Sequence, residues 1–224
     1  MTLAEPGPEA KRAGWLNALG IYRHPKVAAM LFLGFSAGLP FALVAGTLAA
    51  WLTRSGVSMT SVGMFAWVGL LYAFKFAWAP LVDQLRIPLF TRILGRRRSW
   101  MLFAQIGVAG ALLAMAALGP TDNLYLFAGL AVFVAFSSAT QDIAVDAWRI
   151  EAVTIDMQGA MAASYQLGYR VALLVSGGGA LAIGDVSYVL AYQVMALLMG
   201  VGMITVVLIK EPEVSAQNGV QQLS

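Results

Sequence analysis

Long apolar runs alternate with short polar segments along the chain, and six of these runs are long enough to cross a bilayer. A membrane-spanning α-helix needs roughly 20 predominantly apolar residues, and each run meets that length. Apolar runs of this length, in place of ten-residue segments of alternating polarity, exclude a transmembrane β-barrel. The pattern predicts spans at Val27–Leu52, Thr60–Val82, Ser99–Leu118, Leu124–Trp148, Gly159–Ile183 and Ser187–Ile209.

Composition supports an all-α integral membrane protein. Hydrophobic residues make up 60% of the chain and charged residues 11%, whereas soluble domains carry about 25% charged residues. The net charge of +3 is no signature of nucleic-acid binding, and the absence of cysteine excludes disulfides and thiolate metal sites. No nucleophile–base pair stands at usable spacing. The sequence therefore predicts neither an enzyme nor a resident metal or cofactor.

Lysines and arginines gather on one side of the predicted bundle, and the loops on the other side hold only Arg54. Because cytoplasmic loops carry an excess of Lys and Arg, both termini are predicted to be cytoplasmic. The residues on the basic side are Lys11, Arg12, Arg23, Lys26, Arg86, Arg92, Arg96, Arg97, Arg98, Arg149 and Lys210.

The chain divides into three predicted parts. Residues 1–26 form an N-terminal tail, in which residues 10–22 are either an amphipathic helix on the membrane surface or a flexible segment. Residues 27–210 form the six-helix bundle. Residues 211–224 are predicted to be a disordered cytoplasmic tail, because Pro212 stops the last helix and polar residues follow.

The fourth apolar run ends in an unusually polar stretch, Ser137–Arg149. Asp142 and Asp146 are four residues apart and share one helix face. Ionised residues at membrane depth are rare and indicate a pathway or a relay. Asp142 lies a full turn deeper and is predicted to couple protons. Asp146 is either a second coupling residue or an interfacial charge, and Arg149 is assigned to the interface.

Two cations also fall inside predicted spans: Lys75 in the second and Arg170 in the fifth. Either they are structural counter-ions of Asp142, or they line a water-filled cavity and hold an anionic group. The second interpretation is favoured, because buried charge rarely serves packing alone. The neighbouring aromatic and amide residues predicted to bind the same ligand are Tyr72, Trp78, Gln141, Gln166 and Tyr169.

Gly38 and Pro40 lie near the centre of the first predicted span. Proline removes a backbone hydrogen bond and kinks a helix, while small residues allow close helix packing. The pair either opens the helix towards the cavity or serves packing, and both residues are counted among the predicted substrate-binding residues.

Several motifs resemble known transporters. Asp83 followed by Gly95-Arg96-Arg97-Arg98 is similar to the major facilitator signature Gly-x-x-x-Asp-Arg-x-Gly-Arg-Arg, with Ala79 in place of the first glycine and a longer gap. A more specific resemblance, to the AmpG muropeptide permease family, covers roughly Tyr22 to Pro212. Its motifs are Gly34-Phe35-Ser36-Ala37-Gly38-Leu39-Pro40, Gly46-Thr47-Leu48, Phe74-Lys75-Phe76, Gln141-Asp142 and Leu167-Gly168-Tyr169-Arg170.

The resemblance implies a proton-coupled transporter of the bacterial inner membrane. Such a transporter brings anhydromuropeptides from periplasm to cytoplasm, which serves cell-wall recycling and, in some bacteria, β-lactamase induction. It also implies that the chain is the N-terminal major facilitator bundle, a 3+3 inverted repeat. In that superfamily, cytoplasmic charges latch the helices in one conformation, although the positive-inside bias alone accounts for the arginines. The matching residues are Asp83, Arg96, Arg97, Arg98 and Glu151.

The family has two six-helix bundles with the substrate between them, whereas this chain is predicted to contain one. Alternating access needs a second half or a second copy of the chain to move against the first. Two alternative functions remain open. One is transport of another bulky anion, such as a coenzyme A ester, and the other is a membrane scaffold or partner subunit without transport activity.

Overall fold

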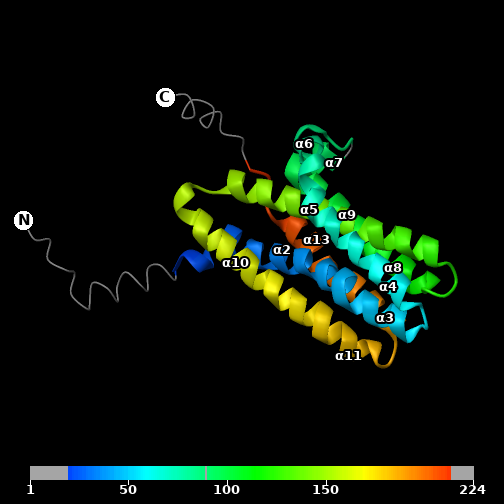
Figure 1. Ribbon diagram of the computed structural model, residues 1–224. Coiled ribbons are helices and arrows are strands. Elements are labelled where there is room, and N and C mark those ends of the chain that lie inside the picture. The colour runs from blue at the N-terminus through cyan, green and yellow to red at the C-terminus, as the bar shows by residue number, and fades with distance from the viewer. Residues whose placement is uncertain (1–19, 89, 213–224) are drawn as a thin grey trace, which may run out of the picture.

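The computed structural model describes residues 20–88 and 90–212, and the regular structure within these ranges is entirely helical (Figure 1). Six of the helices are long and apolar enough to cross a membrane, which confirms the predicted six-span architecture. The predicted tails lie largely outside the described residues. The spans are Pro25–Arg54, Met59–Ala77, Arg96–Leu118, Leu124–Ala152, Ile155–Gly184 and Tyr188–Leu208.

Several spans consist of consecutive helical segments, including two π-helical turns, η2 and η5, and the short 3₁₀ segments η3 and η4. In chain order the elements are η1 (Ile21–Arg23), α2 (Pro25–Ala42), η2 (Leu43–Thr47), α3 (Leu48–Arg54), α4 (Met59–Phe65), η3 (Ala66–Gly69), α5 (Leu70–Ala73), η4 (Phe74–Ala77), α6 (Ala79–Gln84), α7 (Phe90–Leu94), α8 (Arg96–Leu118), α9 (Leu124–Ala152), α10 (Ile155–Leu173), η5 (Leu174–Gly179), α11 (Ala180–Gly184), α12 (Tyr188–Leu198) and α13 (Gly200–Leu208).

Local sequence sets where the spans begin and end. The side chain of Asn123 accepts a hydrogen bond from the Leu126 N–H at 3.0 Å, and that of Ser187 accepts one from the Leu190 N–H at 3.3 Å. These caps satisfy N–H groups that have no intrahelical partner. Gly119 follows α8 with a φ of 70°, a conformation that glycine adopts without steric cost.

Two helix pairs organise the bundle: α2 packs along α10, and α8 packs along α9 (Figure 1). Glycines bring α2 and α10 together. A Cβ atom at Gly34 would collide with the backbone of Tyr165, and one at Gly168 would collide with the backbone of Leu31. Small residues at helix crossings allow this approach, because bundles inside lipid depend on close packing rather than on hydrophobic exclusion from water.

The buried core forms two apolar clusters, one around Trp51 and Phe127 and the other around Met30 and Trp148. A polar level separates them. On each of the three helices α2, α8 and α9, the chain passes from one cluster to the other through a buried polar residue. These residues are Ser36, Gln105 and Gln141, and Gly202 of α13 packs against Ser36.

The second span differs from the prediction. It ends at Ala77 rather than at Val82, and α6 follows as a separate helix with Pro80 in its first turn. Lys75 was expected near the middle of this span, but it lies in η4, close to its end. Proline is tolerated in a first turn, where its missing N–H has no intrahelical partner in any case.

Candidate functional site

Asp142 of α9 lies beside the polar level of the core and is only partly accessible. Its Oδ1 accepts a hydrogen bond from the Tyr165 hydroxyl of α10 at 3.2 Å. A carboxylate held inside a helical bundle needs such donors, because an unpartnered buried charge is strongly unfavourable. The contact joins two residues that are 23 positions apart in sequence. The predicted coupling residue is therefore built into the α9–α10 contact.

Lys75 lies in η4, near the end of the second span, and its side chain is half-buried. Within the described ranges, neither Lys75 nor Arg170 forms an ion pair with Asp142. The simple counter-ion interpretation is therefore not supported for either cation. The Lys75 ammonium group has three N–H donors that can bind an anion.

Three aromatic residues form a small cluster next to Asp142. The rings of Phe41 and Tyr72 meet edge-to-face with centroids 5.4 Å apart, and Tyr169 lies 6.3 Å from Phe41. The Tyr72 hydroxyl is buried and has no hydrogen-bond partner among the described residues. A cavity of about 230 Å³ lies between Phe41, Phe65 and Tyr72. The predicted ligand residues Tyr72 and Tyr169 are thus brought together.

The Trp78 side chain packs against α9. Its Nε1–H donates to the Thr140 hydroxyl at 3.1 Å, and its ring lies 5.0 Å from that of Phe136. One face of the indole therefore already packs against protein. This leaves less of the ring for the ligand binding that we predicted for Trp78.

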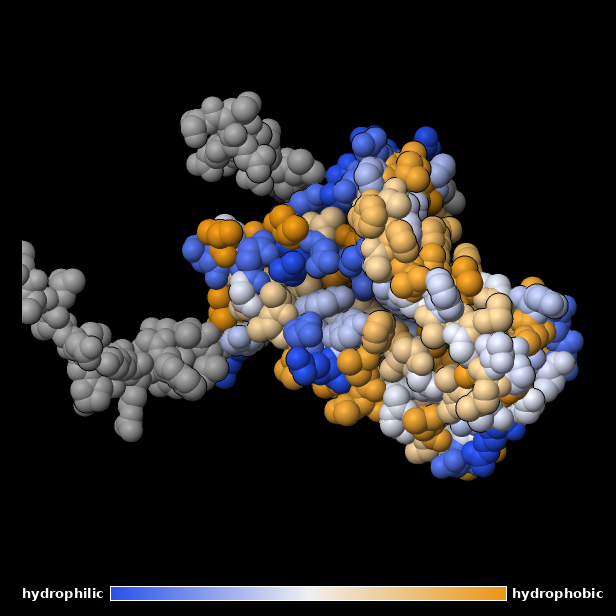
Figure 2. Space-filling model, in the orientation of Figure 1, coloured by the Kyte–Doolittle hydropathy of each residue, from blue (hydrophilic) through white to orange (hydrophobic). Residues whose placement is uncertain are grey.

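Gln166 and Arg170 occupy one exposed face of α10, next to the half-buried Tyr169. Figure 2 views this side of the molecule, and hydrophilic and intermediate atoms lie in a hollow between more hydrophobic flanks. The Arg170 side chain is exposed on this side of the bundle. Its assignment to ligand binding stays a prediction.

Three predicted ligand residues are buried in packing contacts. Gln141 is fully buried, and its Nε2 donates to the Ser36 hydroxyl at 2.9 Å. A Cβ atom at Gly38 would collide with the backbone of Tyr169, and Pro40 is also buried. The close contact of α2 with α10 favours the packing alternative for Gly38 over an opening of the helix towards a cavity. The irregularity lies three residues after Pro40, in the π-helical turn η2.

Sequence reasoning missed three polar residues around this site: Ser36, Gln105 and Tyr165. Gln105 Nε2 donates to the Ser36 hydroxyl at 3.3 Å, so this one hydroxyl accepts from two amides. The Oε1 atoms of Gln105 and Gln141 are buried without partners in the described residues. An uncharged polar residue inside an apolar run was the available signal, but several serines and threonines give the same signal.

A second charged cluster joins α6 to the start of α8 and the end of α9. Arg97 is buried, and it donates to Asp83 Oδ1 and to Glu151 Oε1, each at 2.5 Å. Arg97 Nε also contacts both oxygens of Glu151, which gives a bidentate pair. Such pairs fix orientation as well as adding energy. Three of the five predicted latch residues, Asp83, Arg97 and Glu151, thus lie together, and their role as a latch stays a prediction.

The neighbouring arginines behave differently. Arg98 donates to the backbone carbonyls of Val206 and Val207, at 2.8 and 2.7 Å. No hydrogen bond or ion pair of the Arg96 side chain is found within the described residues. Asp146 contacts Arg149 at 3.4 Å, three residues along the same helix. This local pair favours the interfacial interpretation of Asp146 over a coupling role.

The described residues contain no cluster of His, Cys, Asp or Glu suited to a metal ion. The site instead combines one carboxylate, one nearby ammonium group and a set of tyrosines within a bundle of membrane-spanning helices. The fold defines a multi-pass membrane protein, and ionisable residues inside the spans of such proteins are typical of solute and ion pathways.

Comparison with known proteins gives the family. The family model described as acetyl-coenzyme A transporter 1 matches residues 26–131. The anhydromuropeptide permease of Escherichia coli strain K12 is 43% identical over 196 residues, which are 87% of this chain and 39% of the permease. An AmpG-named transporter of Rickettsia conorii is 33% identical over 196 residues, which are 86% of this chain and 47% of the relative. The chain belongs to the AmpG-type permease family, and it spans less than half the length of these relatives.

Proposed function

We propose that the chain forms one six-helix half of a secondary transporter in the bacterial inner membrane, with both termini in the cytoplasm. Its cargo is an anhydromuropeptide, a sugar–peptide conjugate with free carboxylates, which moves from periplasm to cytoplasm together with protons. The name of the Escherichia coli relative supports the cargo. The observation that carries the proposal is the partly accessible Asp142, which accepts a hydrogen bond from the Tyr165 hydroxyl.

Each part of this site suits one part of the cargo. Lys75 and Arg170 neutralise carboxylates of the stem peptide. Tyr72 and Tyr169, which lie near Phe41, offer aromatic surface to the sugar rings. Asp142 gains and loses a proton during the cycle, and the Tyr165 hydroxyl stabilises its charged form. Alternating access requires a second bundle, supplied by another chain or by a second copy of this one.

A test uses a strain that lacks its own anhydromuropeptide permease. The chain is expressed alone and together with the other half of the Escherichia coli relative, and uptake of labelled anhydromuropeptide is measured. We expect uptake to fall at least tenfold in Lys75→Ala and in Arg170→Ala, whereas Arg92→Ala, an exposed cation on α7, serves as the control. Uptake at the wild-type level in both site variants would end the ligand-binding assignment.

Proton coupling has its own readout. Asp142→Asn keeps the size of the side chain but removes the titratable group. We expect this variant to lose accumulation driven by a proton gradient while keeping exchange of labelled for unlabelled cargo. Unchanged accumulation in Asp142→Asn would refute the coupling role.

A second candidate function is transport of a coenzyme A ester. The match of the acetyl-coenzyme A transporter model favours it, and the matched residues 26–131 include Lys75. A lysine ammonium group suits phosphate as well as carboxylate. Competition of labelled anhydromuropeptide uptake by unlabelled acetyl-coenzyme A separates the two cargoes. A folded chain that moves neither solute, alone or with the complementary half, supports the scaffold function instead.

A further inference from the structure

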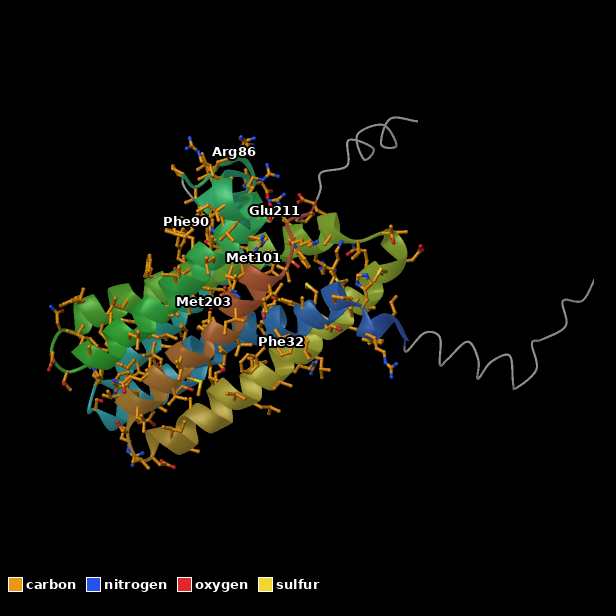
Figure 3. The ribbon with its side chains drawn as sticks, turned by 180° about the vertical axis from the view of Figure 1, so that it is seen from behind. Phe32, Arg86, Phe90, Met101, Met203 and Glu211 are labelled. Carbon is orange, nitrogen blue, oxygen red and sulfur yellow. The ribbon has the colours of Figure 1, made fainter. Side chains whose placement is uncertain are left out.

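A cavity lies between α2 and α13, and neither Lys75 nor Asp142 lines it. Its volume is about 780 Å³, within the roughly 300–1,000 Å³ range of ligand sites. Figure 3 shows the molecule from this side, with Phe32 labelled where α2 meets the neighbouring helices. Phe32 is 46% exposed and Ile204 is 63% exposed. These side chains form the walls of an open, apolar groove.

The groove has a basic mouth at one end. His24 and Lys26 stand at the start of α2, and Lys210 follows the end of α13. From Lys26 to Phe32 the α2 wall runs about 9 Å along the helix axis. The charged end of the groove therefore corresponds to the headgroup zone of a bilayer, and its apolar part corresponds to the beginning of the hydrocarbon.

Packing contacts hold the mouth in place. The Trp148 Nε1–H donates to the carbonyl of Lys210 at 3.1 Å, and Lys26 Nζ donates to the carbonyl of Ala152 at 2.6 Å. One bond of this kind leaves an ammonium group two further N–H donors. Because His24 Nδ1 accepts from the Lys26 N–H, its Nε2 is left to carry the ring proton and to donate.

We propose that this groove binds an anionic phospholipid of the surrounding leaflet, with the phosphate at Lys26 and Lys210 and an acyl chain along Phe32 and Ile204. The proposal rests on the match in charge and polarity between a phospholipid and the groove along the helix axis. A phospholipid is acidic at one end and apolar over the rest, and the groove is basic at one end and apolar over the rest. Basic pockets between membrane-spanning helices are suited to acidic headgroups.

The test uses the full chain in phosphatidylcholine vesicles that contain a small fraction of phosphatidylglycerol with a photoactivatable group on its acyl chain. Cross-linked peptides are mapped by mass spectrometry. We expect labelling of α2 and α13, with competition by unlabelled phosphatidylglycerol and none by phosphatidylcholine. Each cation near an anionic surface is worth about fivefold in affinity, so Lys210→Gln should lower groove labelling about fivefold, and adding Lys26→Gln should lower it further.

Two controls make the result specific. Arg92→Gln removes the same charge from an exposed site on α7 and should leave groove labelling unchanged. Ile204→Trp fills the groove without changing its charge and should lower labelling by any lipid. If Lys26→Gln fails to fold because the Ala152 carbonyl loses its donor, Lys210→Gln alone decides the question.

Three outcomes overturn the proposal. Equal competition by unlabelled phosphatidylcholine and by unlabelled phosphatidylglycerol shows an ordinary annular lipid. Labelling that survives Lys210→Gln at the original level shows that the basic mouth is not used. Absence of labelling by either lipid, with labelling elsewhere on the chain, shows that protein covers the groove.

Discussion

The carboxylate of Glu211 caps the first turn of α8, where it accepts hydrogen bonds from the backbone N–H groups of Arg97 at 2.7 Å and Arg98 at 3.1 Å. The first N–H groups of a helix have no intrahelical partner, and the helix N-terminus attracts negative charge. Glu211 follows the sixth span, so this contact ties the end of that span to the start of the third. The predicted disordered tail begins at this residue, whereas residues 213–224 lie outside the described ranges.

Removing this cap should destabilise the bundle. We expect Glu211→Ala to cost about 0.5–2 kcal/mol, the usual range for loss of an N-cap side chain, and Glu211→Gln to cost less because one acceptor oxygen remains. The measurement is the thermal unfolding midpoint in detergent micelles. Asp122→Ala, which removes an exposed carboxylate from the loop before α9, is the matched control. A midpoint shift no larger than that of the control would contradict the capping role.

Arg97 should contribute far more to stability than its neighbour Arg96. Arg97→Gln leaves the carboxylates of Asp83 and Glu151 facing each other without their shared cation. Breaking a buried ion pair costs about 3–5 kcal/mol, and the partial exposure of both carboxylates places the expected loss at the lower end. Arg96→Gln should lie within about 0.5 kcal/mol of wild type. Unfolding midpoints of the two variants decide the point, and equal midpoints would show that Arg97 is no latch.

The hydropathy pattern was enough to predict the spans, because a segment inside lipid must be apolar along its whole length. Lys75 and Asp142 were identifiable for the converse reason, since charge inside such a segment is exceptional. The partners of these residues were not predictable from the sequence. Tyr165 reaches Asp142, and Glu151 reaches Arg97 from 54 positions away, only because of how the helices pack.

The packing of individual glycines was also not predictable from the sequence. The spacing of small residues indicated close packing somewhere along the first and fifth spans, but the sequence does not show which glycine meets a backbone and which faces open space. Gly34 and Gly38 face the backbone of α10, whereas Gly46 has no neighbour close to its Cβ position. Only the register of α2 against α10 separates these cases.

Gly168 should therefore be intolerant of substitution. A methyl group there would collide with the Leu31 carbonyl and the Phe35 N–H of α2. Overpacking costs about 1–3 kcal/mol and more where backbone must move, so we expect Gly168→Ala to separate the α2–α10 pair and to lower the yield of folded protein. Gly110→Ala, in the middle of α8 with open space at its Cβ position, should be neutral or stabilising. Similar yields and unfolding midpoints for the two variants would contradict the packing described for α10.

Ser36 should be important although it is neither charged nor exposed. Its hydroxyl accepts from Gln105 and Gln141, and Ser36→Ala would leave two buried amide groups without that acceptor. An unsatisfied buried donor costs about 1–3 kcal/mol. We expect a lower unfolding midpoint for Ser36→Ala and partial recovery in the double variant Ser36→Ala with Gln141→Leu, because the second change removes one of the stranded amides. An additive loss in the double variant would show that the two residues act independently.

Tyr165 provides the sharpest test of the coupling site, because a single hydroxyl can be removed without changing the ring. Tyr165→Phe deletes the donor to Asp142, and a hydrogen bond to a charged group contributes about 1.5–3 kcal/mol. We expect proton-driven uptake per folded molecule to fall about tenfold, and the unfolding midpoint to fall by no more than the loss of this hydrogen bond accounts for. Tyr192→Phe removes a buried hydroxyl that donates to the Leu43 carbonyl at 3.3 Å, away from Asp142. This control should lower stability without lowering uptake per folded molecule. If Tyr165→Phe and Tyr192→Phe lowered uptake equally, the effect of Tyr165→Phe would be structural, and Tyr165 would have no role in proton coupling.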